Sequence, residues 1–267
     1  MLLRTLIVPN RLGAIVQSAR AALSLHRAVH SRLESVGTEA NDELARWLLE
    51  RLCPPGGTFL DVGAHIGSVL AGVRRHSNPA RLIAIEAMPD KVANLRRRFP
   101  HVEVHEFAVG AQAGEASFFV DLAQSGYSSL TAREGAGTRE IRVKVVPLDE
   151  ALAGVAVDVM KIDVEGAELA ALRGAAALVD TGRPVIMFES ATLTLDAGAI
   201  WAWFDERDYD VVLPNRVAHL GPPLSREGFE EAHIYPRRTM NYFALPREKR
   251  SVIRDRARAL LGIVATD

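Results

Sequence analysis

The chain reads Phe59-Leu60-Asp61-Val62-Gly63-Ala64-His65-Ile66-Gly67-Ser68 where an apolar segment meets a glycine turn. The apolar half predicts a strand, and Val69 to His76 predicts the helix that follows it. Glycines at a strand-to-helix turn let the backbone adopt positive φ and let a ligand approach closely. The stretch therefore predicts a ligand site at the carboxyl end of a strand.

The spacing of the glycines separates two classes of nucleotide ligand. A dinucleotide site usually reads Gly-x-Gly-x-x-Gly, whereas here Gly63 and Gly67 stand further apart and Asp61 precedes them. A carboxylate at this place repels phosphate but suits S-adenosylmethionine, which carries an ammonium and a sulfonium group. The next predicted strand ends in Glu86, and an acid there accepts hydrogen bonds from ribose hydroxyls. Because NAD shares that ribose, and because both acids could instead cap the following helices, these alternatives stay open.

Composition bounds the class of protein. The 267 residues are 48% hydrophobic and 24% charged, which is the profile of a soluble globular protein. A formal charge of −1 argues against a nucleic-acid partner, which usually requires a basic excess. Cys53 is the only cysteine, which excludes an intrachain disulfide and favours a cytoplasmic location. We find no apolar run that predicts a membrane-spanning helix and no signal peptide.

The predicted domain organisation is an N-terminal helical extension (1–37), one α/β domain (38–246) and a C-terminal amphipathic helix (247–267). Residues 1–33 contain arginines but no acid, and their apolar residues recur at helical spacing. This pattern predicts a helical cap or a homodimer contact. The alternative is a helix that lies on a membrane surface and reaches a lipid-borne substrate.

Between these segments, apolar strands alternate with amphipathic helices, which predicts a parallel sheet covered on both faces. An antiparallel pair, 114–121 with 139–146 and a polar loop at 125–138, interrupts the alternation. A second loop, at 214–238, is expected near the substrate. The predicted strands of the sheet are 58–63, 81–86, 102–107, 157–163, 184–189, 209–213 and 238–245; the predicted helices are 39–52, 67–77, 90–98, 166–179 and 198–207.

A second motif, Asp158 to Glu168, is dense in charge. With the two-residue period of a strand, Lys161, Asp163 and Glu165 share one side. A lysine inside an apolar central strand must be paired, and Asp163 is its expected partner. Because open α/β sheets bind ligands at the carboxyl ends of their strands, Asp163 and Glu165 are expected at the ligand mouth. A structural Lys-Asp pair beside a helix-capping acid is the plainer alternative.

Together these motifs resemble the FkbM-type methyltransferases over about residues 57–190. The matching segments, in family order, are 59–67, 85–89, 107–110, 128–129, 146–149, 161–174 and 187–189. The resemblance implies a class I (Rossmann-like) methyltransferase fold, a doubly wound, seven-stranded, mostly parallel sheet with one antiparallel strand. It also implies S-adenosylmethionine as cofactor and O-methylation as the reaction. His65 stands where the family commonly has Asn, and an imidazole can donate one hydrogen bond as the amide does.

The expected cofactor-binding residues are Asp61, Gly63, Ala64, His65, Gly67, Glu86, Ala108, Ser128 and Ser129. An alcohol is a poor nucleophile, so a base is expected near its proton. The candidates are Asp163 and Glu189, then Glu165, with His219 and His233 as weaker ones. Asp163 and Glu189 could also hold Mg²⁺, which prefers oxygen ligands.

The acceptor implied by the resemblance is a hydroxylated small molecule or saccharide, for example a sugar in a polysaccharide, glycolipid or natural product. Two other classes of function stay open. One is an NAD-dependent oxidoreductase, against which Asp61 and the missing third glycine weigh. The other is a non-catalytic interaction protein that keeps the cofactor fold.

Overall fold

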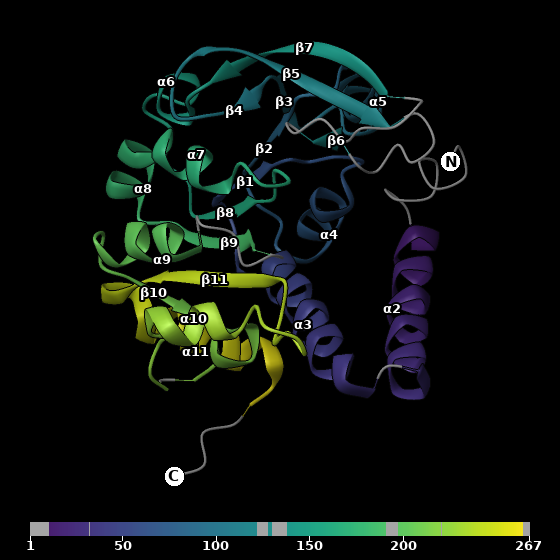
Figure 1. Cartoon of the computed structure of the whole chain (residues 1–267), viewed down its shortest axis with the longest axis vertical. Coiled ribbons are helices and arrows are strands. Elements are labelled where there is room, and N and C mark those ends of the chain that lie inside the picture. Colours follow the sequence, from purple (N-terminus) through teal and green to yellow (C-terminus); the bar gives the residue numbers. More distant parts are fainter. Residues whose placement is uncertain are drawn as a thin grey trace.

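A mostly parallel seven-stranded sheet forms the centre of the protein (Figure 1). The computed structural model describes residues 11–31, 33–121, 128–129, 138–190, 197–219 and 221–263. The strand order is β10-β11-β9-β8-β1-β2-β3, and β11 alone among these strands runs antiparallel to both of its neighbours. The strands are β1 (Thr58–Val62), β2 (Arg81–Glu86), β3 (Glu103–Glu106), β8 (Val159–Ile162), β9 (Val185–Glu189), β10 (Tyr209–Val212) and β11 (Asn241–Pro246). The predicted doubly wound sheet with one antiparallel strand is confirmed.

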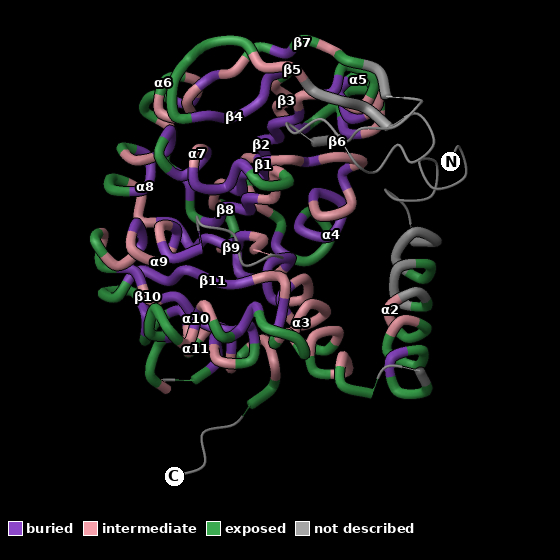
Figure 2. The backbone as a smooth tube through the Cα atoms, viewed as in Figure 1, coloured by how far each residue is buried: buried purple, intermediate pink, exposed green. Residues whose placement is uncertain are grey.

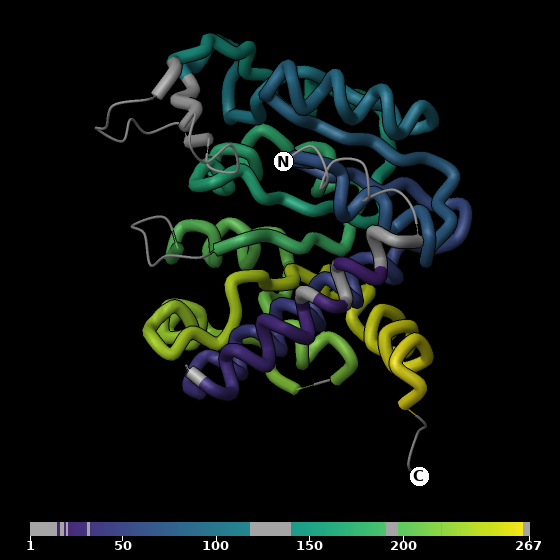
Figure 3. Tube along the Cα trace, turned by 90° about the vertical axis from the view of Figure 1, so that its right-hand side faces the viewer, coloured from purple at the N-terminus to yellow at the C-terminus, as the bar shows by residue number. Residues whose placement is uncertain are grey.

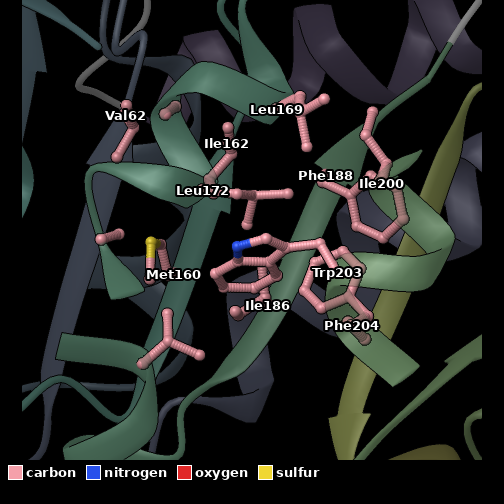
Figure 4. Packing of buried hydrophobic residues seen from close by; sticks show 14 of the residues in the cluster. Val62, Met160, Ile162, Leu169, Leu172, Ile186, Phe188, Ile200, Trp203 and Phe204 are labelled. Carbon is pink, nitrogen blue, oxygen red and sulfur yellow. The ribbon is translucent and has the colours of Figure 1, made fainter. Parts of the chain in front are cut away.

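Helices cover both faces of this sheet, because alternate strand residues point into two separate apolar clusters. Leu60 belongs to one cluster and its neighbour Phe59 to the other. Figure 4 shows the first cluster, in which Trp203 and Phe204 pack near strand residues. Its helices are α6 (Leu148–Ala151), α7 (Glu168–Arg173), α8 (Ala176–Gly182), α9 (Ala197–Asp205) and α10 (Arg226–Glu231). Those of the second cluster are α3 (Val36–Leu52), α4 (Ser68–His76), α5 (Pro89–Arg98) and α11 (Arg250–Leu261).

A smaller sheet lies above the first in Figure 1, with the order β4-β7-β5-β6. Its strands are β4 (Ala108–Val109), β5 (Gly114–Asp121), β6 (Ser128–Ser129) and β7 (Thr138–Val146). The antiparallel pairing of β5 and β7 confirms the predicted pair. The prediction of a polar loop at 125–138 is wrong in one respect, because Ser128 and Ser129 within it form β6, which pairs with β5.

Other boundaries differ from the prediction for identifiable reasons. The helix predicted at 166–179 is divided into α7 and α8, because Asp149 accepts hydrogen bonds from Ala177 and Leu178 and so caps a new helix start. The loop predicted at 214–238 contains the short helices η2 (Pro214–Arg216) and α10, whose first turn Ser225 caps. The helix predicted for the C-terminal tail begins as the 3-10 helix η3 (Arg247–Lys249) and continues as α11.

The helix predicted near the N-terminus is confirmed as α2 (Arg11–Ser31), which lies outside α3 in Figure 1 and in front of it in Figure 3. Much of its described surface is exposed, as the green tube in Figure 2 shows, whereas Ala28 is buried and Ser24 donates to Glu39 at 2.7 Å. Within the described residues, no helix has the length and apolar composition of a membrane span. The domain boundaries, the cytoplasmic location, the membrane-surface contact and the homodimer stay predictions.

Asp42 in α3 fastens the segment that precedes and begins β11. Its Oδ1 atom accepts hydrogen bonds from Thr239 Oγ1 at 2.6 Å, from Met240 N at 2.9 Å and from Asn241 N at 3.2 Å. Thr239 is fully buried, so its hydroxyl group has no access to water. This carboxylate therefore sets where the last strand enters the sheet.

Replacing Asp42 by Ala should lower the free energy of unfolding by about 2–3 kcal/mol, because buried donors lose their acceptor. Urea denaturation followed by circular dichroism measures the change. Asp42→Asn is the matched control, since its amide oxygen still accepts. Equal stability of Asp42→Ala and the wild type would contradict the assignment.

Candidate active site

A cavity of about 340 Å³ opens at the carboxyl ends of β1, β2 and β8. This volume lies within the range of about 300–1,000 Å³ that is typical of small-molecule sites. Seven of the residues expected from the sequence line it: Gly63, Ala64, His65, Glu86, Ala108, Asp163 and Glu165. Lining residues that the sequence analysis did not propose include Ile66, Met88, Lys91, Phe107 and Val109. The structure therefore places most of the two motifs around a single cavity.

The glycine turn has the predicted positive φ at Gly63 and Gly67, but the close approach at both positions is made by protein atoms. Gly63 has a φ of 82°, and a Cβ atom there would lie 1.9 Å from the carbonyl oxygen of Asp163. Gly67 has a φ of 79°, and its Cβ would lie 2.5 Å from Cε2 of Phe99. The space that the sequence analysis left for a ligand is therefore filled by protein. Gly63 lines the cavity, whereas Gly67 packs against α5 and is not among the lining residues.

Glu86 ties together the two loops that border the cavity. Its Oε2 atom accepts from the backbone N–H of His65 at 2.8 Å, and Oε1 accepts from that of Met88 at 2.9 Å. Met88 is the N-cap residue of α5, so part of the helix-capping alternative is correct. Each carboxylate oxygen has a second acceptor position, which leaves Glu86 able to bind a ligand hydroxyl as well.

His65 is held in a strained backbone conformation at the cavity wall. Its φ is 50°, in the left-handed region that costs a non-glycine residue of the order of 1 kcal/mol or more. Burial, together with the positive charges of Lys91 and Lys161, lowers the pKa of His65 to about 4. The imidazole is therefore neutral at pH 7 and has one donor and one acceptor. It can thus donate one hydrogen bond, as expected where His65 replaces the usual Asn.

Lys161 is the buried cation at the centre of the site. Its Nζ atom lies 3.0 Å from Asp163 Oδ2 and 3.5 Å from Asp61 Oδ1, and it donates to the carbonyl of Gly63 at 3.4 Å. Burial alone would lower the pKa of Lys161, but the two carboxylates raise it above the usual value. The predicted Lys161–Asp163 pair is confirmed. The second partner, Asp61, was missed because only the β1–β8 register places it opposite Lys161.

Asp61 is 1% exposed and is not among the residues that line the cavity. The structure thus corrects the expectation that its carboxylate faces the cofactor. Burial raises the pKa of Asp61, and the Lys161 ammonium opposes that rise. Asp61 is a counter-charge for Lys161 and does not line the cavity.

Asp163 and Glu189 form an acid pair with opposite pKa shifts. Burial and a hydrogen bond with Asp163 raise the pKa of Glu189 to about 9. Burial acts in the same direction on Asp163, but the Lys161 charge and the hydrogen bond from Glu189 hold its pKa below the usual value. At pH 7 Asp163 is ionised and Glu189 carries the shared proton. Asp163 lines the cavity, and Glu189 stands beside it at the end of β9 without lining the cavity.

Glu165 is exposed at the cavity wall, with a φ of 57°. The buried Glu168 fixes this turn, because its Oε1 atom accepts from the N–H groups of Val164 and Gly166 at 3.1 Å each. Glu168 belongs to the second motif, but the sequence analysis gave it no role. Glu168 stands three residues after the turn residue Glu165, and this spacing, at which an acid can accept from backbone N–H groups of the turn, could have identified it.

Ser128 and Ser129 lie in β6, but their side chains and the adjoining residues 122–127 and 130–137 lie outside the described residues. Their place at the cofactor therefore stays a prediction.

His233 is buried, and its Nε2 and Nδ1 atoms lie 2.7 Å from Ser190 Oγ and from the Phe229 carbonyl. Neither His219 nor His233 lines the cavity. Over the described part of the chain, no group of three or more His, Cys, Asp or Glu side chains could hold a metal ion.

Solved structures of low identity resemble the chain. Methyltransferase FkbM from Methylobacillus flagellatus KT is 19% identical and aligns with 71% of this chain and 43% of its own, with a TM-score of 0.43. Precorrin-6y C5,15-methyltransferase from Geobacter metallireducens GS-15 is 15% identical over 63% of this chain and 72% of its own, with a TM-score of 0.40. An S-adenosyl-L-homocysteine complex of a SAM-dependent methyltransferase from Thiobacillus denitrificans is 15% identical over 64% of each chain, with a TM-score of 0.36.

At these TM-scores the structural likenesses carry no argument about function, and this chain spans less than half the length of the Methylobacillus protein. Among curated proteins there is no significant match. The family comparison is decisive by contrast. The model of the methyltransferase FkbM domain matches residues 61–211, more than half of the chain and all of the acids of the candidate active site. This protein belongs to the FkbM methyltransferase family.

Proposed function

We propose that this protein transfers a methyl group from S-adenosylmethionine to a hydroxyl group of its acceptor. One observation carries the proposal: a proton-sharing acid pair, Asp163 and Glu189, stands at the carboxyl ends of adjacent strands beside a cavity that Glu86 borders. A carboxylate with a lowered pKa, held beside an acid with a raised pKa, is the arrangement expected of a proton acceptor.

The cavity suits S-adenosylmethionine better than NAD. Glu86 offers the acceptor positions that two ribose hydroxyls need, and Met88 and Phe107 supply apolar wall for a base. The lining residues include three acids, Glu86, Asp163 and Glu165, against two lysines, Lys91 and Lys161, which gives the cavity a small excess of negative charge. This charge favours an ammonium and a sulfonium group and opposes a pyrophosphate. When bound, S-adenosylmethionine would supply an electrophilic methyl group on a positively charged sulfur.

The residues of the chain would then act on the acceptor. Asp163 is the ionised member of the acid pair, so it is the group able to take the hydroxyl proton as the methyl group is transferred. Glu189 donates a hydrogen bond to Asp163 and orients that carboxylate, while Lys161 keeps Asp163 ionised before the acceptor binds. Well-oriented reactants can gain about 7–11 kcal/mol of the barrier, so holding the hydroxyl in line with the methyl group matters as much as the base.

A saccharide in a polysaccharide, glycolipid or natural product is the proposed acceptor class, which rests on the family resemblance. Labelled S-adenosylmethionine incubated with a panel of hydroxylated acceptors, with and without Mg²⁺, tests the reaction. Absence of methyl transfer to any acceptor would favour a non-catalytic interaction protein. Transfer that a chelator abolishes would favour the alternative in which Asp163 and Glu189 hold Mg²⁺.

Replacing Glu86 by Ala should weaken binding of S-adenosylhomocysteine by about 5- to 150-fold, equivalent to the loss of charged hydrogen bonds worth about 1–3 kcal/mol. Calorimetric titration measures the affinity. The matched control is Glu106→Ala, because Glu106 ends the neighbouring strand β3 and is exposed. An unchanged affinity in a folded Glu86→Ala protein would exclude Glu86 from the cofactor site.

Asp163→Asn should lower kcat by about 10²- to 10⁴-fold, the range of general-base catalysis. Glu189→Gln should retain most of the turnover, because the amide group still donates to Asp163 as the protonated carboxyl does. Single-turnover methyl transfer separates these variants. If Glu189→Gln loses as much as Asp163→Asn, then Glu189 is the base.

The pH profile of kcat/KM distinguishes the same roles independently. Since the pKa of Glu189 is about 9, it is protonated below that pH and becomes a second anion above it. Activity should therefore fall as the pH rises through about 9, and this decline should be absent in Glu189→Gln. On the acidic side, activity should persist to pH values below the usual pKa of a carboxyl group, because the pKa of Asp163 is lowered. Activity that increases through pH 9 would contradict the assignment.

A further inference from the structure

A second cavity, of about 360 Å³, lies near the first turn of α3. Three segments that are far apart in the sequence form it: the start of α3, the residues after β10 and the segment before β11. Its lining residues are Glu34, Gly37, Asn41, Leu213, Asn215, Arg216, Pro236, Arg237 and Arg238. We call it the arginine cavity, and no residue of the proposed methyl-transfer machinery lines it.

The arginine cavity lies along the same edge of the sheet as the candidate active site. Because β11 is antiparallel to both β9 and β10, the carboxyl ends of β9 and β10 and the amino end of β11 meet at one edge. Asn241, which begins β11, pairs with Glu189, which ends β9. Figure 1 shows the order β2, β1, β8, β9, β11 and β10 from top to bottom. The acid pair therefore stands between the two cavities.

The arginine cavity carries an excess of positive charge. Arg216, Arg237 and Arg238 come from two segments, and within the described residues none of them forms an ion pair. Glu34 also lines the cavity, but it makes no ion pair with them. Arg216 uses Nη1 to donate to the carbonyl of Pro222 at 3.2 Å, so its other N–H groups and the guanidinium groups of Arg237 and Arg238 are the donors offered to an anionic ligand.

Contacts with α3 hold the backbone of the arginine segment in place. Thr38 Oγ1 donates to the carbonyl of Arg237, and Asn41 Nδ2 donates to that of Arg238 at 2.8 Å. Both contacts use backbone oxygens, so the two arginine side chains are not needed for them. The α3 helix also directs the positive end of its dipole toward the cavity, where its first-turn residue Gly37 is a lining residue.

We propose that the arginine cavity binds a phosphate group on the methyl acceptor, an inference that rests on the proposed function. A phosphate monoester carries a charge of about −1.5 to −2 at pH 7 and accepts bidentate bonds from arginine. Three guanidinium groups match that charge better than they match a single carboxylate. Three strand spacings, about 14 Å, separate β8, which Asp163 follows, from β10. A phosphorylated saccharide of two or more rings can span this distance, with its hydroxyl group at Asp163 and its phosphate at the arginines.

Titration of the full-length protein with inorganic phosphate at constant ionic strength tests the site directly. Phosphate should bind the wild type, and Arg237→Gln/Arg238→Gln should weaken that binding about tenfold or more. The control is Arg142→Gln/Arg173→Gln, which removes the same charge from exposed positions outside both cavities. Glu34→Gln should strengthen binding, because it removes the opposing carboxylate. Equal phosphate affinity in the two double variants, or no binding to the wild type, would overturn the proposal.

Methyl transfer to sugar phosphates, to the parent sugars and to uronic acids then tests the role in the acceptor site. The phosphorylated acceptor should have the highest kcat/KM in the wild type, and the Arg237→Gln/Arg238→Gln variant should lose that preference mainly through KM. A preference for uronic acids would overturn the phosphate assignment in favour of a carboxylate. Binding of S-adenosylhomocysteine, measured in the same variants, separates the two proposals: its absence refutes the cofactor, whereas its presence without phosphate binding refutes only the arginine cavity.

Discussion

The buried ammonium of Lys161 is the constraint on which the site depends. An isolated charge in an apolar sheet would cost many kcal/mol, so the fold supplies Asp163 from the same strand and Asp61 from the neighbouring one. With Glu189 close by, there are more carboxyl groups than one cation can neutralise. Glu189 therefore keeps its proton and uses it in a hydrogen bond to Asp163. The opposite states of the two acids follow from the position of one lysine.

Close backbone approaches hold this electrostatic centre in place. The carbonyl of Asp163 occupies the space that a side chain at position 63 would need, so the loops after β1 and β8 pack directly together. Glu86 and Glu168 then bind backbone N–H groups of the two turns. The left-handed conformations of His65 and Glu165, both at the cavity wall, are maintained by these contacts. Strain concentrated at a ligand cavity is typical of a preorganised site.

The parallel sheet also explains why chemically different groups share one edge. Strands that run in one direction bring their following loops to the same end, so residues from distant parts of the sequence can act on one extended ligand. The antiparallel β11 contributes the residues before it to that edge rather than those after it. Arg237 and Arg238 consequently lie on the same side of the sheet as Glu189, and α3 fixes them there through Asn41.

Much of this organisation could be predicted from the sequence, because the signals are local. Alternating apolar periods gave the doubly wound sheet, the glycine turn after β1 gave the cavity, and the two-residue period within β8 gave the Lys161–Asp163 pair. Strand register and loop packing are not local. Asp61 opposes Lys161 only because β1 pairs with β8 in a particular register, and the space for a side chain at Gly67 is lost only because Phe99 at the end of α5 packs against it. The tertiary structure decided these roles, since a buried charge or a missing Cβ has meaning only beside the atoms that long-range packing places next to it.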